Sequence, residues 1–167
     1  MGVADGKVDQ VNVQHANLYG EYELTVDSKH RLIVPSEIKK LLRPDVEGAA
    51  FFLIVGQNRK PWLYPENYWN ELAAQLKQQI APDEDLLEFE QMQFARARRI
   101  EWDKAGRILL PEKTLRRTNT KNDVTMIGVR DHLEIWNRQE WDAREEDLTN
   151  RMPEILRRIR QSKSQSP

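Results

Sequence analysis

The chain has 167 residues, and its 26 Lys and Arg nearly balance its 27 Asp and Glu, giving a net charge of −1. Hydrophobic residues make up 39% and charged residues 32%, which is typical of a globular protein and excludes collagen-like or low-complexity architectures. The absence of Cys excludes a disulfide framework and a Cys nucleophile. No apolar run reaches the roughly 20 residues of a membrane helix, and no secretory signal is evident, so we expect a cytoplasmic protein.

Hydrophobic periodicity in the first half predicts four short strands. They span residues 22–26, 31–34, 50–55 and 62–64. Ser36 is expected to cap a short helix that stops at Pro44. A helix over 66–80 follows the last strand, and after a Pro-containing break a second helix extends to about residue 97.

The second half repeats this order of elements. Strands are predicted at residues 100–102, 108–110, 124–129 and 133–136, with a short helix around residue 115. A long helix begins near Arg138, where Asn137 and Glu140 have the spacing of a capping box, and Pro153 is expected to kink or restart it. The polar ends, residues 1–17 and 161–167, are predicted to be disordered.

One motif occurs twice. Asp27-Ser-Lys-His-Arg31-Leu-Ile-Val-Pro35 returns 76 positions later as Asp103-Lys-Ala-Gly-Arg107-Ile-Leu-Leu-Pro111. Each copy is followed by an apolar run and a Trp-containing strand. A unit of about 45 residues is near the size at which a core no longer stabilises itself. Two equivalent halves would bury their faces against each other, which predicts one pseudo-twofold barrel with helices outside.

The charges are segregated along the chain. Residues 83–90 hold five acids and no base, whereas residues 96–117 hold eight bases against three acids, a local net charge of +5. The tail adds Arg157, Arg158, Arg160 and Lys163. Basic patches of this kind suit a phosphate backbone whatever the total charge, although any one cluster can also be a solvated helix face.

These motifs resemble the MraZ family. Gly20-Glu-Tyr22 with the first Asp-x-x-x-Arg motif is similar to the first family signature. The second motif, with Ile127-Gly-Val-Arg-Asp-His-Leu-Glu-Ile-Trp136 and Glu140-Trp141, is similar to the second signature. The resemblance covers about residues 19–147.

The resemblance implies a β-rich α+β fold of tandem SpoVT-AbrB-like swapped-hairpin repeats. The implied domains are repeats at 21–68 and 97–140, linking helices at 69–96, a disordered extension at 1–18, and a C-terminal helix with a basic tail at 141–167. It also implies a sequence-specific DNA-binding transcriptional regulator of the division and cell-wall gene cluster. Its partners would be repeated promoter boxes in double-stranded DNA and further copies of itself in a ring-shaped homo-oligomer, associated with the nucleoid.

The residues that the resemblance nominates for DNA contact lie in the two turns. They are Lys29, Arg31, Lys104 and Arg107, with Asp27 and Asp103 orienting the turns. An Arg at a rigid turn presents a planar fork that fits a phosphate or the O6 and N7 atoms of guanine, and Lys supplies a point charge. Further candidates are His30, Arg96, Arg98 and Arg99.

Several alternatives stay open. Each motif Arg can instead form only a structural salt bridge with its Asp, and the other arginines can lie on a solvated surface. His30 stands where the family has Gly, as at Gly106, so the first turn can be degraded or retuned. The alternative function is therefore a ring-forming interaction protein that has lost specific DNA readout. A third reading is an antitoxin-like binder using residues 148–167.

The sequence gives little support for a catalytic function. Asp27 and Asp103 are a conceivable hydrolytic carboxylate pair, but the sequence has no phosphate-binding Gly-rich loop, metal-ligand spacing or nucleophile with its base. We therefore expect a non-enzyme with no cofactor, no metal, no membrane partner and no small-molecule substrate.

Overall fold

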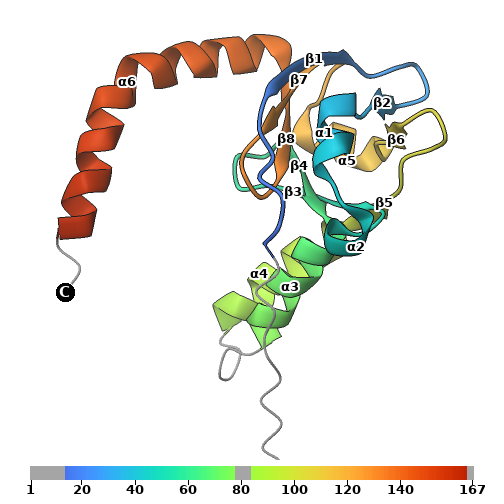
Figure 1. Cartoon of the computed structure of the whole chain (residues 1–167), viewed down its shortest axis with the longest axis horizontal. Helices are drawn as coiled ribbons and strands as arrows, with labels where there is room; N and C mark the ends of the chain where they lie inside the picture. Colours follow the sequence, from blue (N-terminus) through green and yellow to red (C-terminus); the bar gives the residue numbers. More distant parts are fainter. Residues whose placement is uncertain (1–13, 78–83, 165–167) are drawn as a thin grey trace, which may run out of the picture.

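The computed structural model describes residues 14–77 and 84–164, which form eight short strands and six helices (Figure 1). The strands are β1 (Glu21–Thr25), β2 (Arg31–Ile33), β3 (Phe51–Val55), β4 (Pro61–Pro65), β5 (Arg98–Ile100), β6 (Arg107–Leu109), β7 (Asp123–Gly128) and β8 (Leu133–Asn137). The helices are α1 (Ser36–Leu41), α2 (Pro44–Glu47), α3 (Glu66–Lys77), α4 (Glu84–Arg96), α5 (Glu112–Thr118) and α6 (Arg138–Ser164). The predicted elements are confirmed to within a few residues. The short α2 was not predicted, and the predicted end of α3 at 78–80 lies outside the described residues.

The strands form two antiparallel sheets. The larger sheet has the order β1-β7-β8-β4-β3-β5, and β2 pairs with β6 separately. The two halves exchange partners reciprocally, because β1 of the first half pairs with β7 of the second, and β5 of the second pairs with β3 of the first. The expected mixed α+β fold is confirmed. Closure into one barrel is not confirmed, since the pairing in the described chain leaves β1 and β5 as the two edges of the larger sheet.

One hydrophobic core joins both halves. Leu32 and Ile108 lie opposite each other in the β2–β6 pair, and both are fully buried. They meet side chains from strands of both halves, including Phe51, Leu63 and Met126. Because each half contributes to the same core, the position of the β2–β6 pair depends on both.

The ends of the described chain correct the predicted disorder. Leu18 is 1% exposed and its backbone N–H donates to the carbonyl of Arg130 at 2.7 Å. The N–H of Ala16 donates to Oε1 of the buried Glu47 at 2.8 Å. Residues 14–18 of the expected extension are therefore ordered, while 1–13 lie outside the described residues. At the other end α6 continues to Ser164, so disorder at 161–164 is also wrong, and 165–167 lie outside the described residues.

Two predicted helix caps are wrong, and one predicted kink is confirmed. Pro35 is the N-cap of α1, and Ser36 lies in the first turn without a capping hydrogen bond. Asn137 directs its Oδ1 to the backbone N–H of Lys121 at 2.7 Å instead of to the first turn of α6. Helix α6 continues through Pro153 and bends sharply part-way along its length (Figure 1). A proline inside a helix removes one hydrogen bond and clashes with the preceding turn, which produces a kink.

Candidate nucleic-acid interface

A closed set of hydrogen bonds around Asp27 holds the first turn. Its Oδ1 accepts the backbone N–H groups of Lys29 at 2.9 Å and Arg31 at 2.8 Å, and its Oδ2 accepts Nε–H of Arg31 at 2.8 Å. The backbone N–H of His30 donates to the carbonyl of Asp27 at 3.0 Å. The carboxylate therefore fixes both the shape of the turn and the direction in which the Arg31 side chain leaves it.

The second turn repeats these hydrogen bonds, and in it Nη2 of Arg107 also lies 2.9 Å from Oδ2 of Asp103. Oδ1 of Asp103 accepts the backbone N–H groups of Ala105 at 2.9 Å and Arg107 at 3.0 Å, and Oδ2 accepts Nε–H of Arg107 at 2.9 Å. The residue before the Arg has a positive φ in both turns, 61° at His30 and 76° at Gly106. Glycine adopts this conformation without a steric cost, whereas it is uncommon for any other residue.

The hydrogen bonds keep both carboxylates charged. The pKa of Asp27 is lowered mainly by the backbone N–H of Arg31, and the pKa of Asp103 mainly by the backbone N–H of Arg107. The guanidinium groups lower both pKa values further. Each turn therefore keeps its Asp–Arg ion pair through the neutral pH range.

The pairing of β2 with β6 brings the two turns together. The N–H of Val34 donates to the carbonyl of Gly106 at 2.8 Å, and the N–H of Leu110 donates to the carbonyl of His30 at 2.8 Å. Each turn is thus bonded to the strand end of the opposite half. Figure 1 shows both turns projecting from the same side of the molecule, away from α6.

The exposed face of the β2–β6 pair combines cations with apolar side chains. Arg31 lies opposite Leu109, and Ile33 lies opposite Arg107. Because side chains alternate along a strand, these four share the face that points away from the core. Ile33 is 50% and Leu109 58% exposed. The two arginines are diagonal neighbours across the strand pair, a relation that places Cα atoms about 7–8 Å apart.

The other predicted contacts occupy two places. Lys29 and Lys104 lie exposed at the tips of the turns, beside the predicted arginines. Arg96, Arg98 and Arg99 lie at the junction of α4 and β5, and β5 belongs to the larger sheet.

Two arginines at this junction have internal partners. Nη1 of Arg98 donates to two backbone carbonyls at the end of α4, at 3.1 and 2.7 Å. Arg99 forms ion pairs with Glu66 at 2.5 Å and Glu101 at 2.6 Å, which raise the pKa of its guanidinium. These contacts favour a structural role for Arg98 and Arg99. Arg96 is half-buried in the last turn of α4.

Sequence reasoning missed Lys39 of α1. Its Nζ lies against Gly106, in the space that a Cβ at that position would need. The position 76 residues later, in α5, is Leu115, so only the second turn gains this ammonium group. No local signal marks Lys39, because α1 belongs to the first half and the turn to the second.

Sequence reasoning also missed a buried ionic cluster at the β7–β8 turn. His132 is 7% exposed and stacks on Trp62 with 4.2 Å between ring centroids. Its ring nitrogens contact Asp131 at 2.6 Å and Glu134 at 3.1 Å. Burial opposes the charged forms, but these contacts outweigh it, raising the pKa of His132 and lowering that of Glu134. The cluster anchors the turn on β4.

The described residues also bear on two other kinds of site. Over 14–77 and 84–164, none of the helices combines the length and the apolar composition that a membrane span requires. Within the same ranges, no group of three or more His, Asp or Glu side chains has an arrangement that could hold a metal ion.

The fold and the site define a mixed α+β protein whose similarly ordered halves exchange strands and carry paired Asp–Arg turns. A family model described as "MraZ protein, putative antitoxin-like" matches residues 18–90 and 93–158, which include both turns. The chain therefore belongs to the MraZ family.

Curated relatives agree over most of the chain. A protein of Clostridium tetani is 35% identical over 123 residues, covering 74% of this chain and 83% of the relative. One of Acetivibrio thermocellus is 34% identical over 125 residues, covering 75% and 84%. One of Thermomicrobium roseum is 31% identical over 140 residues, covering 84% and 95%. All three are named "Transcriptional regulator MraZ".

Proposed function

We propose that this chain is a DNA-binding transcriptional regulator that holds double-stranded DNA against the β2–β6 pair and its two turns. The observation that carries the proposal is the duplicated geometry. In each turn the carboxylate of the motif Asp accepts the Nε–H of the motif Arg. The β2–β6 pairing joins the two turns. The names of the relatives support the same function.

The chemistry of this surface fits duplex DNA. The major groove of B-DNA, about 12 Å wide, admits a two-stranded β-ribbon. Arg31 and Arg107 would donate from their terminal amino groups to guanine or phosphate, and Lys29 and Lys104 would contact the backbone. The exposed apolar side chains between the arginines suit thymine methyl groups. His30 on one turn and Lys39 on the other would make the two turns unequal.

We also propose the finer architecture that the family resemblance implies. Repeats at 21–68 and 97–140 would be SpoVT-AbrB-like units completing a pseudo-twofold barrel, joined by 69–96 and flanked by 1–18 and 141–167. The reciprocal β1–β7 and β3–β5 pairing supports this. Copies would form a ring on repeated promoter boxes of the division and cell-wall gene cluster, in the cytoplasm at the nucleoid, as a non-enzyme. A ring repeats one modest site, so matching boxes bind by multivalency.

Fluorescence anisotropy with the chain's own upstream DNA and a scrambled duplex tests the proposal. We expect specific binding that weakens steeply with salt as counterions return to the phosphates. Each bidentate Arg contributes about 1–3 kcal/mol of discrimination, so Arg31→Ala with Arg107→Ala should lower specific affinity by roughly 5- to 150-fold per residue. Arg31→Lys with Arg107→Lys should keep the salt dependence but lose sequence preference, because Lys lacks the planar fork.

The control removes the same charge elsewhere. Arg59→Ala with Arg144→Ala, in the exposed β3–β4 turn and on the exposed first part of α6, should leave specific affinity within about twofold. Equal weak binding to both duplexes would refute specific readout. That outcome would favour the alternative, a ring-forming interaction protein, for which the strained His30 in the first turn is the supporting observation.

A further inference from the structure

The C-terminal part of α6 carries an apolar stripe that the described chain leaves uncovered. The stripe consists of Leu148, Met152, Ile155, Leu156 and Ile159. This spacing places all five within about 100° of the helix circumference. Met152, Leu156 and Ile159 are 43%, 44% and 48% exposed. The main contacts of α6 are with β7 and β8, and its far end extends away from the sheets (Figure 1).

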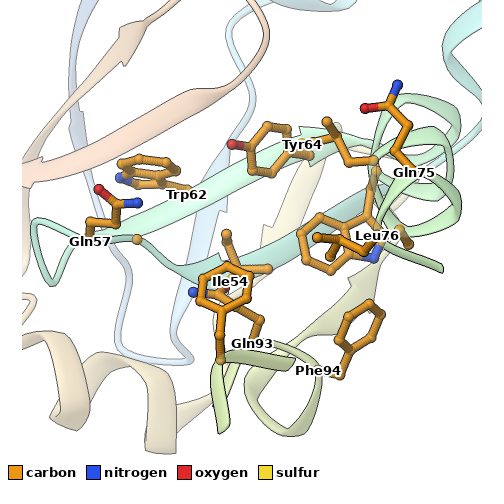
Figure 2. Close-up of a pocket in the computed structure, with 13 residues that line it drawn as sticks. Ile54, Gln57, Trp62, Tyr64, Gln75, Leu76, Gln93 and Phe94 are labelled. Atoms are coloured by element: carbon orange, nitrogen blue, oxygen red, sulfur yellow. The ribbon is translucent and has the colours of Figure 1, made fainter. Parts of the chain in front are cut away.

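An apolar groove lies between β4, α3 and α4. Figure 2 shows Trp62 and Tyr64 of β4 lining one wall and Phe94 of α4 lining another, with Leu76 of α3 between them. The groove has a volume of about 290 Å³. Phe89 and Phe94 on its α4 wall are both 44% exposed. The groove is therefore large enough to accept apolar side chains, and the two phenylalanines of its α4 wall are accessible to them.

The stripe and the groove carry opposite charges. Residues 151–163 of α6 hold five bases and one acid, a net charge of +4, whereas α4 holds four acids and one base, a net charge of −3. Opposite potentials accelerate association and fix the orientation of two surfaces. The lengths also agree, since the stripe spans about 18 Å along the helix and α4 about 20 Å.

We propose that the apolar stripe of α6 docks into the α3–α4 groove of a second copy of this chain. The two surfaces differ, so the contact is head-to-tail, and its repetition closes a ring or extends a filament. This inference rests on the ring assembly of the proposed function and names the two surfaces that form it.

Mass measurement by light scattering tests the stripe. Leu156→Glu with Ile159→Glu should reduce the oligomer to smaller species at a concentration at which the parent is assembled. Asn150→Glu with Gln161→Glu adds the same charge to the opposite face of the helix and should keep the parent mass. Circular dichroism checks that both variants remain folded. A stripe variant with the parent mass would overturn the proposal.

Cross-linking tests the pairing directly, because the chain has no Cys. Gln75→Cys at the groove and Leu156→Cys on the stripe should form a disulfide-linked dimer when the two variants are mixed, but neither should do so alone. Gln161→Cys, on the opposite face, should give no such dimer with Gln75→Cys. Equal yields from the stripe and the opposite face would overturn the proposal.

The same variants separate this inference from the proposed function. The stripe variant should bind a single DNA box as the parent does and lose about 100-fold or more on repeated boxes, because only multivalency is removed. Unchanged assembly of the stripe variant, with specific DNA binding intact, overturns only the interface. A monomeric parent overturns both the ring and the interface, whereas loss of specific binding by an assembled parent overturns only the readout.

Discussion

The two turns differ at the position before the motif Arg, and exchanging the residue there measures the strain stored in the first turn. His30 has φ 61° and Gly106 has φ 76°. A side chain in the left-handed region costs about 1–2 kcal/mol, while glycine loses about 0.5–1 kcal/mol more chain entropy on folding. We therefore expect His30→Gly to raise the free energy of unfolding by about 0.5–1 kcal/mol.

The reverse change should act in the opposite direction. Gly106→Ala introduces the left-handed penalty and places a Cβ against Nζ of Lys39. Because Ala restricts the unfolded chain more than Gly does, the substitution recovers only about 0.4–1 kcal/mol of stability. The expected net loss is about 1 kcal/mol, with a small contribution from Lys39, because the end of that side chain can move.

Urea unfolding followed by Trp fluorescence, at one fixed protein concentration, gives these free energies. The concentration is fixed because association itself raises apparent stability. For a chain of this length about 1 kcal/mol corresponds to roughly 2–4 °C in Tm. His30→Ala is the matched control, since it removes the imidazole but keeps the strain. A His30→Gly variant no more stable than His30→Ala would refute the reasoning.

Three further predictions concern the core, the N-terminal segment and pH. Leu32→Ala should lower the free energy of unfolding, measured by urea titration, by about 2–5 kcal/mol, because the side chain is fully buried. The control Ile33→Ala, on the exposed face, should lower it by less than about 0.5 kcal/mol. Glu47→Gln should cost about 1–3 kcal/mol and speed proteolysis near residues 14–18, because the buried carboxylate accepts the N–H groups of Ala16 and Arg43. Because the pKa of His132 is raised on folding, its contribution to stability is complete below the unfolded pKa of about 6.5 and is lost as pH rises through the folded pKa. Because the pKa of Glu134 is lowered, its contribution is lost as pH falls through the folded pKa. His132→Phe should flatten the alkaline loss in unfolding measured across pH.

Contacts within a few residues were predictable from sequence. Asp27 and Arg31 are four positions apart, and every hydrogen bond of Asp27 in the turn lies inside that interval. The repetition at Asp103 and Arg107 made the pattern recognisable. The motif therefore predicts both turns, although it does not give their distance from one another.

Contacts between distant segments were not predictable in this way. Lys39 reaches Gly106 only because β2 pairs with β6, and a helical pattern around Lys39 contains no trace of that pairing. His132 was one of three scattered histidines in the sequence, and its partner Trp62 comes from another strand. The predicted cap at Asn137 is wrong for the same reason, since its Oδ1 accepts from a loop 16 residues earlier.

The exchange of strands also explains why the backbone at His30 adopts the left-handed conformation. Its carbonyl accepts the N–H of Leu110, while the carbonyl of Gly106 accepts that of Val34. The left-handed conformation at each position aims these carbonyls across the boundary between the halves. Relaxing His30 to negative φ would turn its carbonyl away and break a bond that joins the two turns. The hydrogen bond between the halves therefore requires the strained conformation at His30, so the shape of either turn depends on the other.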